Sequence, residues 1–460
     1  MYPLTRLILV LALAPLLPAQ VGAPDRGQSK YWELPADTMI PTRTVLRQET
    51  VTLSQPAHVL VQSDGALKPT GWPTSTQAWI QIKINGAPAS NTSYMDWHRS
   101  VAPRIHSYNT LCAPLLPAGT HTIELEAHTQ DGTVMVTAKS NLCIFVNPAE
   151  KVVQARSTQD TPPVQSTLPT GQGPERCTWT QLDYHPVVQL QIPEPEVPIF
   201  TFASAHVYDI ASAGDMMLGI FPDHPIHTAE PQLHYQATFS VQDVWTVSEF
   251  QSPIYSQGVW YGVPSEEFDA TVTMGATGYP PSTPHGPPLQ FAIQAGATLV
   301  ALHGGLQVKG WAGNTVGTVC DPICIGGVAA GCPVMGTPVV ISTATITIPP
   351  GHDGRVMFAG KARNQGQGLD GASHTTMHLA IDGNVVGSQG EQGLAGWLGG
   401  WDACKSQRTM STSYLATGAN ALTPGTHVIE LIATVVPHVT PARTIRVSIW
   451  DDDPFLVWFD

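Results

Sequence analysis

Two segments of twelve residues, far apart in the chain, are nearly the same, and this repeat restricts the fold more than any other feature. Residues 116–127 read LPAGTHTIELEA, and residues 422–433 read LTPGTHVIELIA. Eight positions are identical at an offset of 306 residues. Such a match over a long separation indicates that part of the chain is duplicated.

Other matching segments support the duplication, and they occur in the same order in both parts of the chain. Ser107 and Tyr108 match Ser413 and Tyr414, again at an offset of 306. Small drifts in the offset elsewhere are typical of loop insertions between the strands of a duplicated module. The remaining pairs are 82–86 with 379–383, 50–53 with 345–348, and 59–61 with 356–358.

The repeated segments have the pattern of amphipathic strands. In residues 119–127, Thr120, Thr122 and Glu124 alternate with apolar neighbours, and this period of two predicts a strand with one solvated face. Asn85-Gly86 and Asp382-Gly383 are dipeptides favoured in two-residue hairpin turns. Amphipathic strands need a second sheet over their apolar face. The sequence therefore predicts an all-β chain of tandem antiparallel β-sandwich domains, jelly-roll-like in organisation.

The repeat also suggests where the domains lie. We place the first β-sandwich module at residues 45–148 and its repeat at 336–460. Residues 149–194 are polar and contain Pro and Gly, which predicts a linker. Residues 195–335 lack the repeat and predict a middle β-domain. This is either a diverged third sandwich, which we favour, or an unrelated β-domain.

The beginning of the chain predicts export. Arg6 precedes a short apolar run and Ala19, so residues 1–19 resemble a cleaved signal peptide. The run is too short to anchor the chain in a bilayer, so we expect a secreted, extracellular protein with no membrane span. Removal of Arg6 leaves 20 basic and 35 acidic residues, and 20 − 35 gives a net charge of −15. This balance disfavours nucleic-acid binding, which needs clustered Lys and Arg.

Seven cysteines remain after residue 19, and in a secreted protein they predict disulfides. Cys112 and Cys143 both fall in the first module, and we expect them to form one bond. Four other cysteines could form two more bonds, and the sequence does not show which pairs with which. Alternatively, Cys320, Cys324 and Cys332 bind zinc. Cys177 is then left over. The four are Cys320, Cys324, Cys332 and Cys404.

The repeated phrase resembles known β-sandwich families. An apolar strand, an Asn-Gly or Asp-Gly hairpin, Ser-Tyr, and then Leu-x-x-Gly-Thr-His-x-Ile-Glu-Leu-x-Ala is similar to the later strands of C1q/TNF-like jelly-roll domains. Carbohydrate-binding modules of the galactose-binding-like type carry a similar phrase. The first resemblance implies modules that trimerise, or that pack on each other within one chain. The second implies glycan binding through aromatic residues or polar loop ends.

Metal ligands are a weaker signal. Asp223, His224 and His227 are close together in a predicted loop, and such residues bind zinc or copper. Histidine pairs in loops also occur without metal. Three successive aspartates at 451–453 suggest Ca²⁺, although an acidic turn before a last strand is the simpler interpretation. We expect no cofactor, with calcium and zinc as the alternatives. The repeated His121 and His427 each stand alone, and we expect them to bond to neighbouring loops.

Four aromatic residues are the candidates for ligand binding. Trp260, Tyr261, Trp397 and Trp401 lie in loop-like, glycine-rich settings. An exposed indole can stack on a sugar ring, and the same ring can instead pin a loop to the core. Asn91 begins an N-glycosylation sequon, Asn-Thr-Ser, which would require a surface position.

Three functions remain open from the sequence. The leading hypothesis is a secreted, non-enzymatic structural or adhesive protein that self-assembles as a homo-oligomer or binds a glycan or cell-surface partner. The alternative is a lectin-like carbohydrate-binding protein. The weaker alternative is a secreted carbohydrate-active enzyme that uses Glu266 and Glu267, but no catalytic motif accompanies these residues. We therefore expect no enzyme activity.

Overall fold

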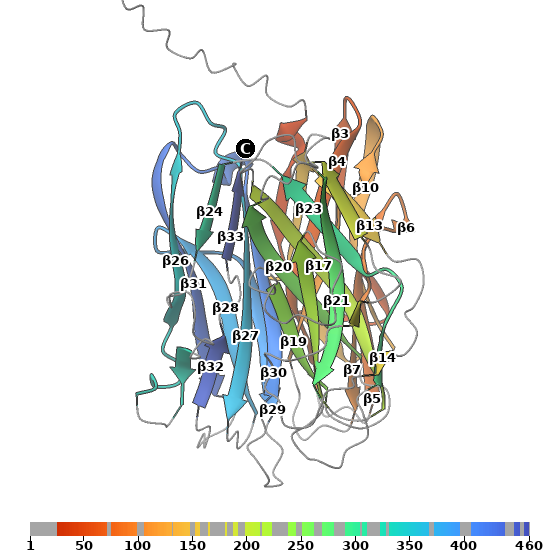
Figure 1. Ribbon diagram of the computed structural model, residues 1–460, viewed down its shortest axis with the longest axis vertical. Coiled ribbons are helices and arrows are strands. Elements are labelled where there is room, and N and C mark those ends of the chain that lie inside the picture. The colour runs from red at the N-terminus through yellow and green to blue at the C-terminus, as the bar shows by residue number, and fades with distance from the viewer. Residues whose placement is uncertain are drawn as a thin grey trace, which may run out of the picture.

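The computed structural model shows an all-β chain of antiparallel sheets (Figure 1), which confirms the predicted fold class. Its helical parts are two short 3-10 turns, Arg26–Gln28 and Gly418–Asn420, among the residues described. In the part of the chain that the structure describes, no helix is both long and apolar enough to cross a membrane. The structure describes residues 25–70, 75–98, 105–130, 132–147, 152–156, 164–165, 180–181, 187–191, 198–211, 214–222, 238–244, 251–261, 269–279, 290–303, 306–310, 323–327, 331–367, 372–395, 406–437, 446–450 and 455–459.

Residues 25–147 form two facing antiparallel sheets, which we call the N-terminal sandwich. The outer sheet runs β3–β10–β5, with β6 and β7 also paired to β5. The inner sheet runs β1–β12–β4–β11–β2, with β8 and β9 paired to β4. Ile123 and Leu125 of the outer sheet pack against Val59 and Val61 of the inner sheet in one apolar core. The strands are β1 (Lys30–Glu33), β2 (Thr38–Ile40), β3 (Arg43–Leu53), β4 (Ala57–Pro69), β5 (Ser75–Ile84), β6 (Ala87–Pro88), β7 (Ser93–His98), β8 (His106–Cys112), β9 (Leu115–Leu116), β10 (Gly119–Thr129), β11 (Val134–Val136) and β12 (Asn141–Asn147).

The C-terminal sandwich has the same strand pairing. Its outer sheet runs β26–β31–β28–β29, as the N-terminal one runs β3–β10–β5. In its inner part, β27 pairs with β30, β32 and β33, as β4 pairs with β8, β11 and β12. The repeated segments therefore occupy equivalent strands. The strands are β24 (Leu306–Gly310), β25 (Ile323–Gly326), β26 (Val339–Ile348), β27 (Val356–Gln367), β28 (Ala372–Ile381), β29 (Asn384–Ala395), β30 (Ser406–Ala416), β31 (Gly425–Pro437), β32 (Arg446–Trp450) and β33 (Phe455–Phe459).

The middle of the chain pairs its strands in the same order, although it lacks the sequence repeat. β21 pairs with β16 and β18, and β18 pairs with β19. β17 pairs with β20, β22 and β23. We call this part the middle sandwich. The strands are β13 (Val152–Arg156), β14 (Val164–Gln165), β15 (Thr180–Gln181), β16 (Val187–Gln191), β17 (Pro198–Ala211), β18 (Gly214–Pro222), β19 (Thr238–Val244), β20 (Gln251–Tyr261), β21 (Asp269–Tyr279), β22 (Gln290–Ile293) and β23 (Thr298–His303).

The strand pairing differs from the predicted layout at three places. β1 and β2 precede residue 45 but pair with β12 and β11 of the N-terminal sandwich. Residues 149–194, which composition marks as a linker, contain β13, β14, β15 and β16, all paired with strands of the middle sandwich. In addition, β24 and β25 precede residue 335 but pair with β33 and β32 of the C-terminal sandwich. Short strands at a sheet margin bury little apolar surface, so a polar composition does not reveal them.

One part of the repeat is shifted relative to the sequence match. Tyr108 lies opposite Gly65 of β4, whereas Tyr414 lies opposite Phe358 of β27. Because residues 59–61 match 356–358, the strand position equivalent to Tyr414 is that of Cys112. Both tyrosine rings still pack in the core of their own sandwich. The two copies therefore fill the core with a tyrosine from different positions along equivalent strands.

The predicted Cys112–Cys143 disulfide is wrong. Cys112 lies opposite Val61, and Cys143 lies opposite Gln62 on the other side of the same strand, β4. Two strand spacings separate the cysteines by about 9–10 Å, beyond the span of about 7 Å that a disulfide allows. Their side chains also point to opposite faces of the sheet, Cys112 into the sandwich core and Cys143 away from it.

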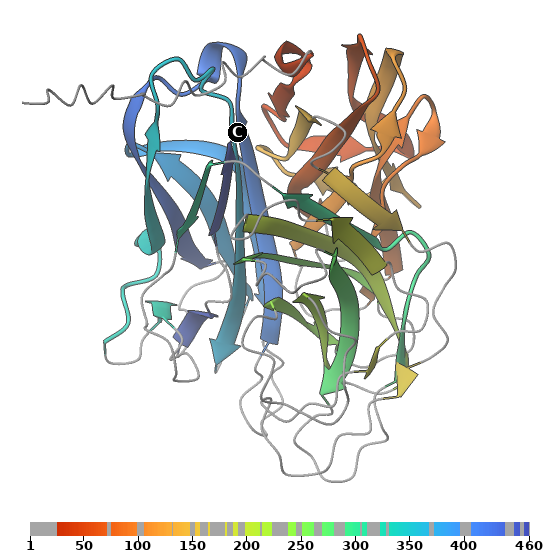
Figure 2. The ribbon, with the colours of Figure 1, turned by 45° about the horizontal axis from the view of Figure 1, so that its top comes forward.

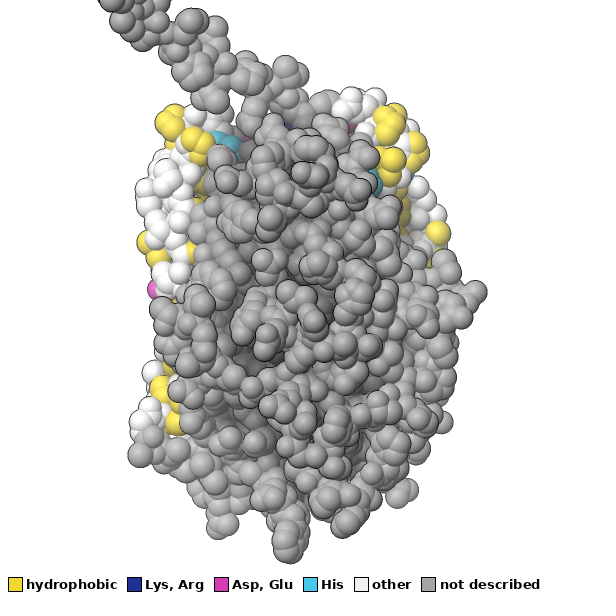
Figure 3. Space-filling view, in the orientation of Figure 1, with side chains coloured by type: hydrophobic (Ala, Val, Ile, Leu, Met, Phe, Trp, Pro, Cys, Tyr) yellow, Lys and Arg dark blue, Asp and Glu magenta, His cyan; other side chains and the backbone are white. Residues whose placement is uncertain are grey.

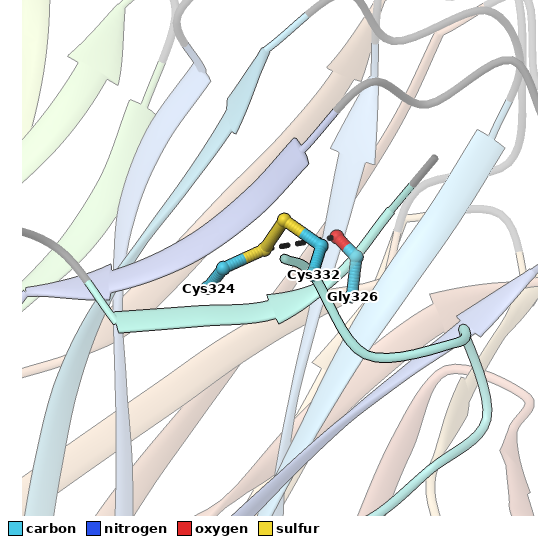
Figure 4. The surroundings of a disulfide bond; sticks show 3 residues. All are labelled: Cys324, Gly326 and Cys332. Carbon is cyan, nitrogen blue, oxygen red and sulfur yellow. Dashed lines mark hydrogen bonds between the residues drawn. A yellow bond between two sulfur atoms is a disulfide. The ribbon is translucent and has the colours of Figure 1, made fainter. Parts of the chain in front are cut away.

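A disulfide joins Cys324 of β25 to Cys332, with Cα atoms 5.4 Å apart (Figure 4). This bond selects one of the pairings that the sequence left open. In this bond neither sulfur is a thiolate, which is the form of cysteine that binds zinc. Cys177, Cys320 and Cys404 lie outside the described residues.

Mapping of alkylated peptides from the unfolded, unreduced protein should find Cys112 and Cys143 both alkylated, because β4 holds them apart during folding. The peptide with Cys324 and Cys332 should carry an internal disulfide. Mass spectrometry after proteolysis makes the measurement, and reduction before alkylation is its control. A peptide pair linked through Cys112 and Cys143 would contradict the strand order.

The repeated histidines bond to neighbouring loops, as predicted. His121 has Nε2 2.8 Å from the Pro117 carbonyl oxygen and Nδ1 3.0 Å from Asn85 Nδ2. His427 has Nε2 2.8 Å from the Thr423 carbonyl oxygen and Nδ1 2.7 Å from Asp382 Oδ2. The ring of His121 therefore contacts a carbonyl oxygen on one side and the Asn85 side-chain amide on the other. His427 faces two acceptors and fits the charged form.

The turn residues in these contacts are held in the left-handed region. Asn85 and Asp382 have φ values of 52° and 51°, and each accepts a hydrogen bond from the backbone of the strand beside it. Burial opposes the charge of His427, but the Thr423 carbonyl and Asp382 outweigh it and raise its pKa. The hydrogen bond from His427 lowers the pKa of Asp382. The two copies therefore make the same contact, with an amide as the turn partner in one and a carboxylate in the other.

Exchanging the turn residues should exchange the pH dependence. The raised pKa of His427 and the lowered pKa of Asp382 mean that their pair stabilises the fold fully between about pH 4 and about pH 6.5, and that this contribution is lost as the pH rises through the folded pKa of His427. Asp382→Asn should therefore lower the unfolding temperature at about pH 5.5 and have a smaller effect at about pH 8.5. Asn85→Asp is the matched variant and should gain stability at the lower pH. Thermal unfolding of both variants across this range makes the test, and equal effects at both pH values would contradict it.

Candidate functional site

The inner sheets of the three sandwiches meet in one apolar cluster. Leu60 and Phe145 come from the N-terminal sandwich, Phe200 from the middle one and Met357 from the C-terminal one. All four are at most 2% exposed. The other members are Leu111, Ala113, Cys143, Phe202, Tyr255, Val300, Leu302, Ala359 and Leu415.

The contacts between the sandwiches run in a ring (Figure 2). β7 of the N-terminal sandwich packs against β20, and β19 of the middle sandwich contacts β30. β29 of the C-terminal sandwich packs against β4 and β8 of the first. β7, β19 and β29 are equivalent strands, each beside the third strand of its outer sheet. Each sandwich thus covers the inner sheet of the next, and the third covers the first, which makes the arrangement closed.

A buried carboxylate lies where the first and third sandwiches meet. Asp64 of β4 is completely buried. Ser411 and Ser413 of β30 donate hydrogen bonds to its two oxygens from the C-terminal sandwich. Gln62 Nε2 donates to Oδ2 at 3.0 Å, and Asn109 Nδ2 donates to Oδ1 at 2.6 Å. Burial raises the pKa of Asp64, and the four hydrogen bonds lower it without cancelling that effect.

This cluster is built to hold a negative charge or a proton rather than a cation. All four partners direct hydrogens at the carboxylate, whereas a metal ion needs oxygen lone pairs directed at it. The site is sealed from water, so Asp64 has no access to a substrate. Sequence reasoning missed Asp64, although a charged residue inside the mainly apolar strand AHVLVQSDGALKP is a signal that could have identified it.

Other polar contacts also join the first and third sandwiches. Arg355, 3% exposed, donates to Ser29 Oγ at 2.8 Å and to the Val146 carbonyl at 2.9 Å. Its guanidinium lies 4.4 Å from the centre of the Phe145 ring, within the range of a cation–π contact. Asn141 Nδ2 donates to the Ser413 carbonyl at 2.7 Å. These directional contacts fix one sandwich against the other across more than 200 residues of sequence.

The boundary between the first and middle sandwiches contains the glycosylation sequon. Asn91 is 1% exposed, and its Nδ2 donates to Ser204 Oγ of β17 at 2.9 Å. Its Oδ1 accepts from the Leu111 backbone at 3.2 Å. A buried amide with both ends bonded is not accessible for glycan attachment, so the sequon is structural in the folded chain.

The outer sheet of the N-terminal sandwich carries a row of stacked rings. His128, Trp79 and Tyr94 are cross-strand neighbours on β10, β5 and β7. The centre of the Trp79 ring lies 4.8 Å from the centre of the His128 ring and 5.7 Å from the centre of the Tyr94 ring. The ring planes are nearly parallel in both pairs. Tyr94 in turn lies 5.3 Å from His206 of the middle sandwich. Both faces of Trp79 are therefore occupied, and this indole has no free face for a sugar ring.

Beside these rings, one carboxylate collects several donors. Glu126 accepts from Lys83 at 2.7 Å, from Gln81 at 2.9 Å and from His128 at 2.7 Å, and it pairs with Arg43. Burial alone would raise the pKa of Glu126, but these bonds lower it to about 2. The fold does not require the network, because Ile432 occupies the position of Glu126 in the C-terminal copy.

Most predicted site residues lie outside the described residues. These are Trp397 and Trp401, the ligand-binding candidates in the glycine-rich segment, and Asp223, His224 and His227, the metal candidates. Trp260 and Tyr261 end strand β20, where their backbones pair with Ile199 and Pro198. No side-chain placement is described for either aromatic residue. Within the part of the chain that the structure describes, no group of three or more His, Cys, Asp or Glu residues is placed to hold a metal ion.

Comparisons with known proteins leave the family open. No protein-family model matches the sequence, and no curated protein matches it. Among solved structures, the chain is similar to the tandem CBM22-1–CBM22-2 domains of Xyn10C from Paenibacillus barcinonensis, with 10% identity and a TM-score of 0.18 over 61% of this chain and 100% of that one. It is also similar to Broad bean stain virus, with 7% identity and a TM-score of 0.19 over 64% and 95%. These scores are low, and the fold rests on the strand pairing itself.

Replacing the buried carboxylate should change how stability depends on pH. The raised pKa of Asp64 means that the folded chain binds this proton more firmly than the unfolded one. The wild type therefore loses stability as the pH rises from about 4 through the folded pKa. Asp64→Asn removes this dependence, so its stability relative to wild type should increase between about pH 4 and pH 7. Denaturant unfolding at several pH values measures it, and a relative stability that falls over this range would contradict the assignment.

Proposed function

We propose that the protein is a secreted, non-enzymatic structural or adhesive protein in which three jelly-roll sandwiches form a closed ring within one chain. The observation that supports this most is the closure itself. β29 returns to cover β4 and β8, and the C-terminal Ser411 and Ser413 bond to the N-terminal Asp64. The resemblance to C1q/TNF-like domains implies modules that either trimerise or pack within one chain, and the ring corresponds to the second arrangement.

The ring gives the proposed function a physical basis. A closed set of sandwiches with a shared core is rigid, and its outer sheets and loops remain for partners. The buried cluster offers no nucleophile or base to solvent. Secretion is part of the proposal and rests on the signal-like residues 1–19.

The solution mass of the mature protein tests the closure. Within one chain, each inner sheet is already covered by a neighbouring sandwich, so no inner sheet is left to bind another copy. We therefore expect no trimer at any concentration. Size exclusion with multi-angle light scattering measures this. A stable trimer would contradict the closed ring, because it would mean that the inner faces bind between chains.

The carbohydrate-binding alternative is tested separately. It depends on Trp397, Trp401, Trp260 and Tyr261, and it predicts that Trp397→Ala or Trp401→Ala abolishes binding on a glycan array while leaving the unfolding temperature unchanged. Our proposal predicts no such loss. Release of reducing sugars from a polysaccharide panel that disappears in Glu266→Gln or Glu267→Gln would instead establish an enzyme and overturn the proposal.

A further inference from the structure

One position on the central strands of the inner sheets carries a different polar residue in each sandwich. The central strands β4, β17 and β27 first reach the shared apolar cluster through Leu60, Phe200 and Met357, respectively. Their pairing is regular over the next four residues, so the fourth residue faces the same way. These fourth residues, which we call the boundary residues, are Asp64, Ser204 and Lys361.

The boundary residues are buried, although two of them are of charged types. Asp64 and Ser204 have no exposed surface, and Lys361 is 2% exposed. By contrast, the described atoms at the two sides of the molecule in Figure 3 are mainly apolar or uncharged. Aspartate and lysine are costly to bury, and an apolar residue would fill the same space at a lower cost. A role other than filling space is therefore expected for this position.

Each boundary residue meets a strand from another sandwich. Asp64 of the first sandwich accepts hydrogen bonds from Ser411 and Ser413 on β30 of the third. Ser204 of the middle sandwich donates to the Asn109 carbonyl oxygen on β8 of the first, at 3.0 Å. The strands β8, β20 and β30 are equivalent, because each pairs with the central strand of its own sandwich.

The third boundary follows the same rule. Gln257 on β20 of the middle sandwich donates from Nε2 to the Ala359 carbonyl oxygen at 3.2 Å, two residues before Lys361 on β27. Gln257 also accepts from the Tyr255 hydroxyl at 2.8 Å. β20 therefore brings an amide and a phenol to this boundary, where β30 brings two serines to Asp64.

The strands that meet the boundary residues are not interchangeable. The position of Ser413 on β30 is opposite Ala359, and the equivalent positions are Leu111 on β8 and Gln257 on β20. If β8 covered Asp64, Leu111 would replace a donor and leave the buried carboxylate with fewer hydrogen bonds. Loss of a partner from a buried charge is strongly unfavourable.

We propose that the boundary residues determine which sandwich covers which, and so fix the order of the ring. Each polar residue is matched by the strand of one other sandwich and mismatched by the remaining strands, which disfavours wrong pairing within a chain and between copies. This inference rests on the closed ring of the proposed function and adds the positioning residues that select its order.

Refolding of a variant with identical boundary residues tests the proposal. Asp64→Ser combined with Lys361→Ser gives all three sandwiches a serine at this position. The full mature chain is unfolded in denaturant, diluted at one fixed concentration and measured by light scattering. The wild type should return to monomer. The variant should form mispaired oligomers, with the ratio of monomer to oligomer lowered by about tenfold or more, because the charge-assisted bonds of Asp64 no longer favour one order.

Glu126→Ser combined with Lys83→Ser is the matched control. It also removes a buried acid and a buried lysine, which are 0% and 8% exposed and form a pair at 2.7 Å. This pair lies on the outer sheet of the first sandwich, away from the boundaries. The control should unfold at a lower temperature than the wild type and still refold to monomer.

A cross-link gives a second measurement, which reports the order itself. Cys143 Sγ lies 3.6 Å from Ser413 Oγ across the first and third sandwiches. In Ser413→Cys, where Ser411 keeps its bond to Asp64, mild oxidation should therefore join positions 143 and 413 within one chain. Adding the two boundary substitutions should lower the yield of this cross-link, and adding the control pair should not.

Two outcomes would overturn the proposal. One is a double boundary variant that returns to monomer with the full cross-link yield, and the other is a control that forms oligomers to the same extent. If the double variant does not refold, Asp64→Ser and Lys361→Ser alone should each show the same change to a smaller degree. A wild type that is itself a trimer would instead contradict the closed ring, so the two failures are distinguishable.

Discussion

The inner sheet of the first sandwich is buried on both faces, and the arrangement of the chain depends on this constraint. Residues 59–67 of β4 are all buried. Val59 and Val61 point into the sandwich core, and Leu60 points into the cluster shared by the three sandwiches. One sandwich alone would expose the second face to water, at a cost that grows with its apolar area. Covering this face with neighbouring units removes that cost, and in the closed ring a strand of a neighbour lies against the described inner strands of each sandwich.

Hydrophobic burial favours the ring but does not set its angles, because the effect has no direction. The directional contacts at the boundary between the first and third sandwiches supply that information. Each of these contacts forms only when the two sandwiches have one particular relative orientation. They are the hydrogen bonds from Ser411 and Ser413 to Asp64, the contact of Arg355 with the Phe145 ring, and the hydrogen bond from Asn141 to the Ser413 carbonyl. A buried carboxylate is a costly way to gain such precision, which fits a place where two segments distant in sequence must meet correctly.

The duplication carried most of what could be predicted. The period-two strands, the hairpin turns and the loop-bonded His121 and His427 depend on residues close in sequence or on neighbouring strands, and the structure confirms them. The predicted Cys112–Cys143 bond was wrong. Two cysteines in the same module need not be neighbours, and here β4 lies between the strands that carry them. Asn91 has a surface motif but is buried for a similar reason. Part of its environment comes from β17, where Ser204 lies more than 100 residues away in sequence.

The sequence by itself determined that the chain is all-β, that two of its parts share one strand order, and where their turns fall. These features follow from side-chain period and turn chemistry, which act over a few residues. The tertiary structure decided that a third part has the same strand order, that the three sandwiches close on one another, and that Asp64 lies at the junction. Each of these depends on which faces meet, and a pattern of alternating residues marks a face as apolar without saying what covers it.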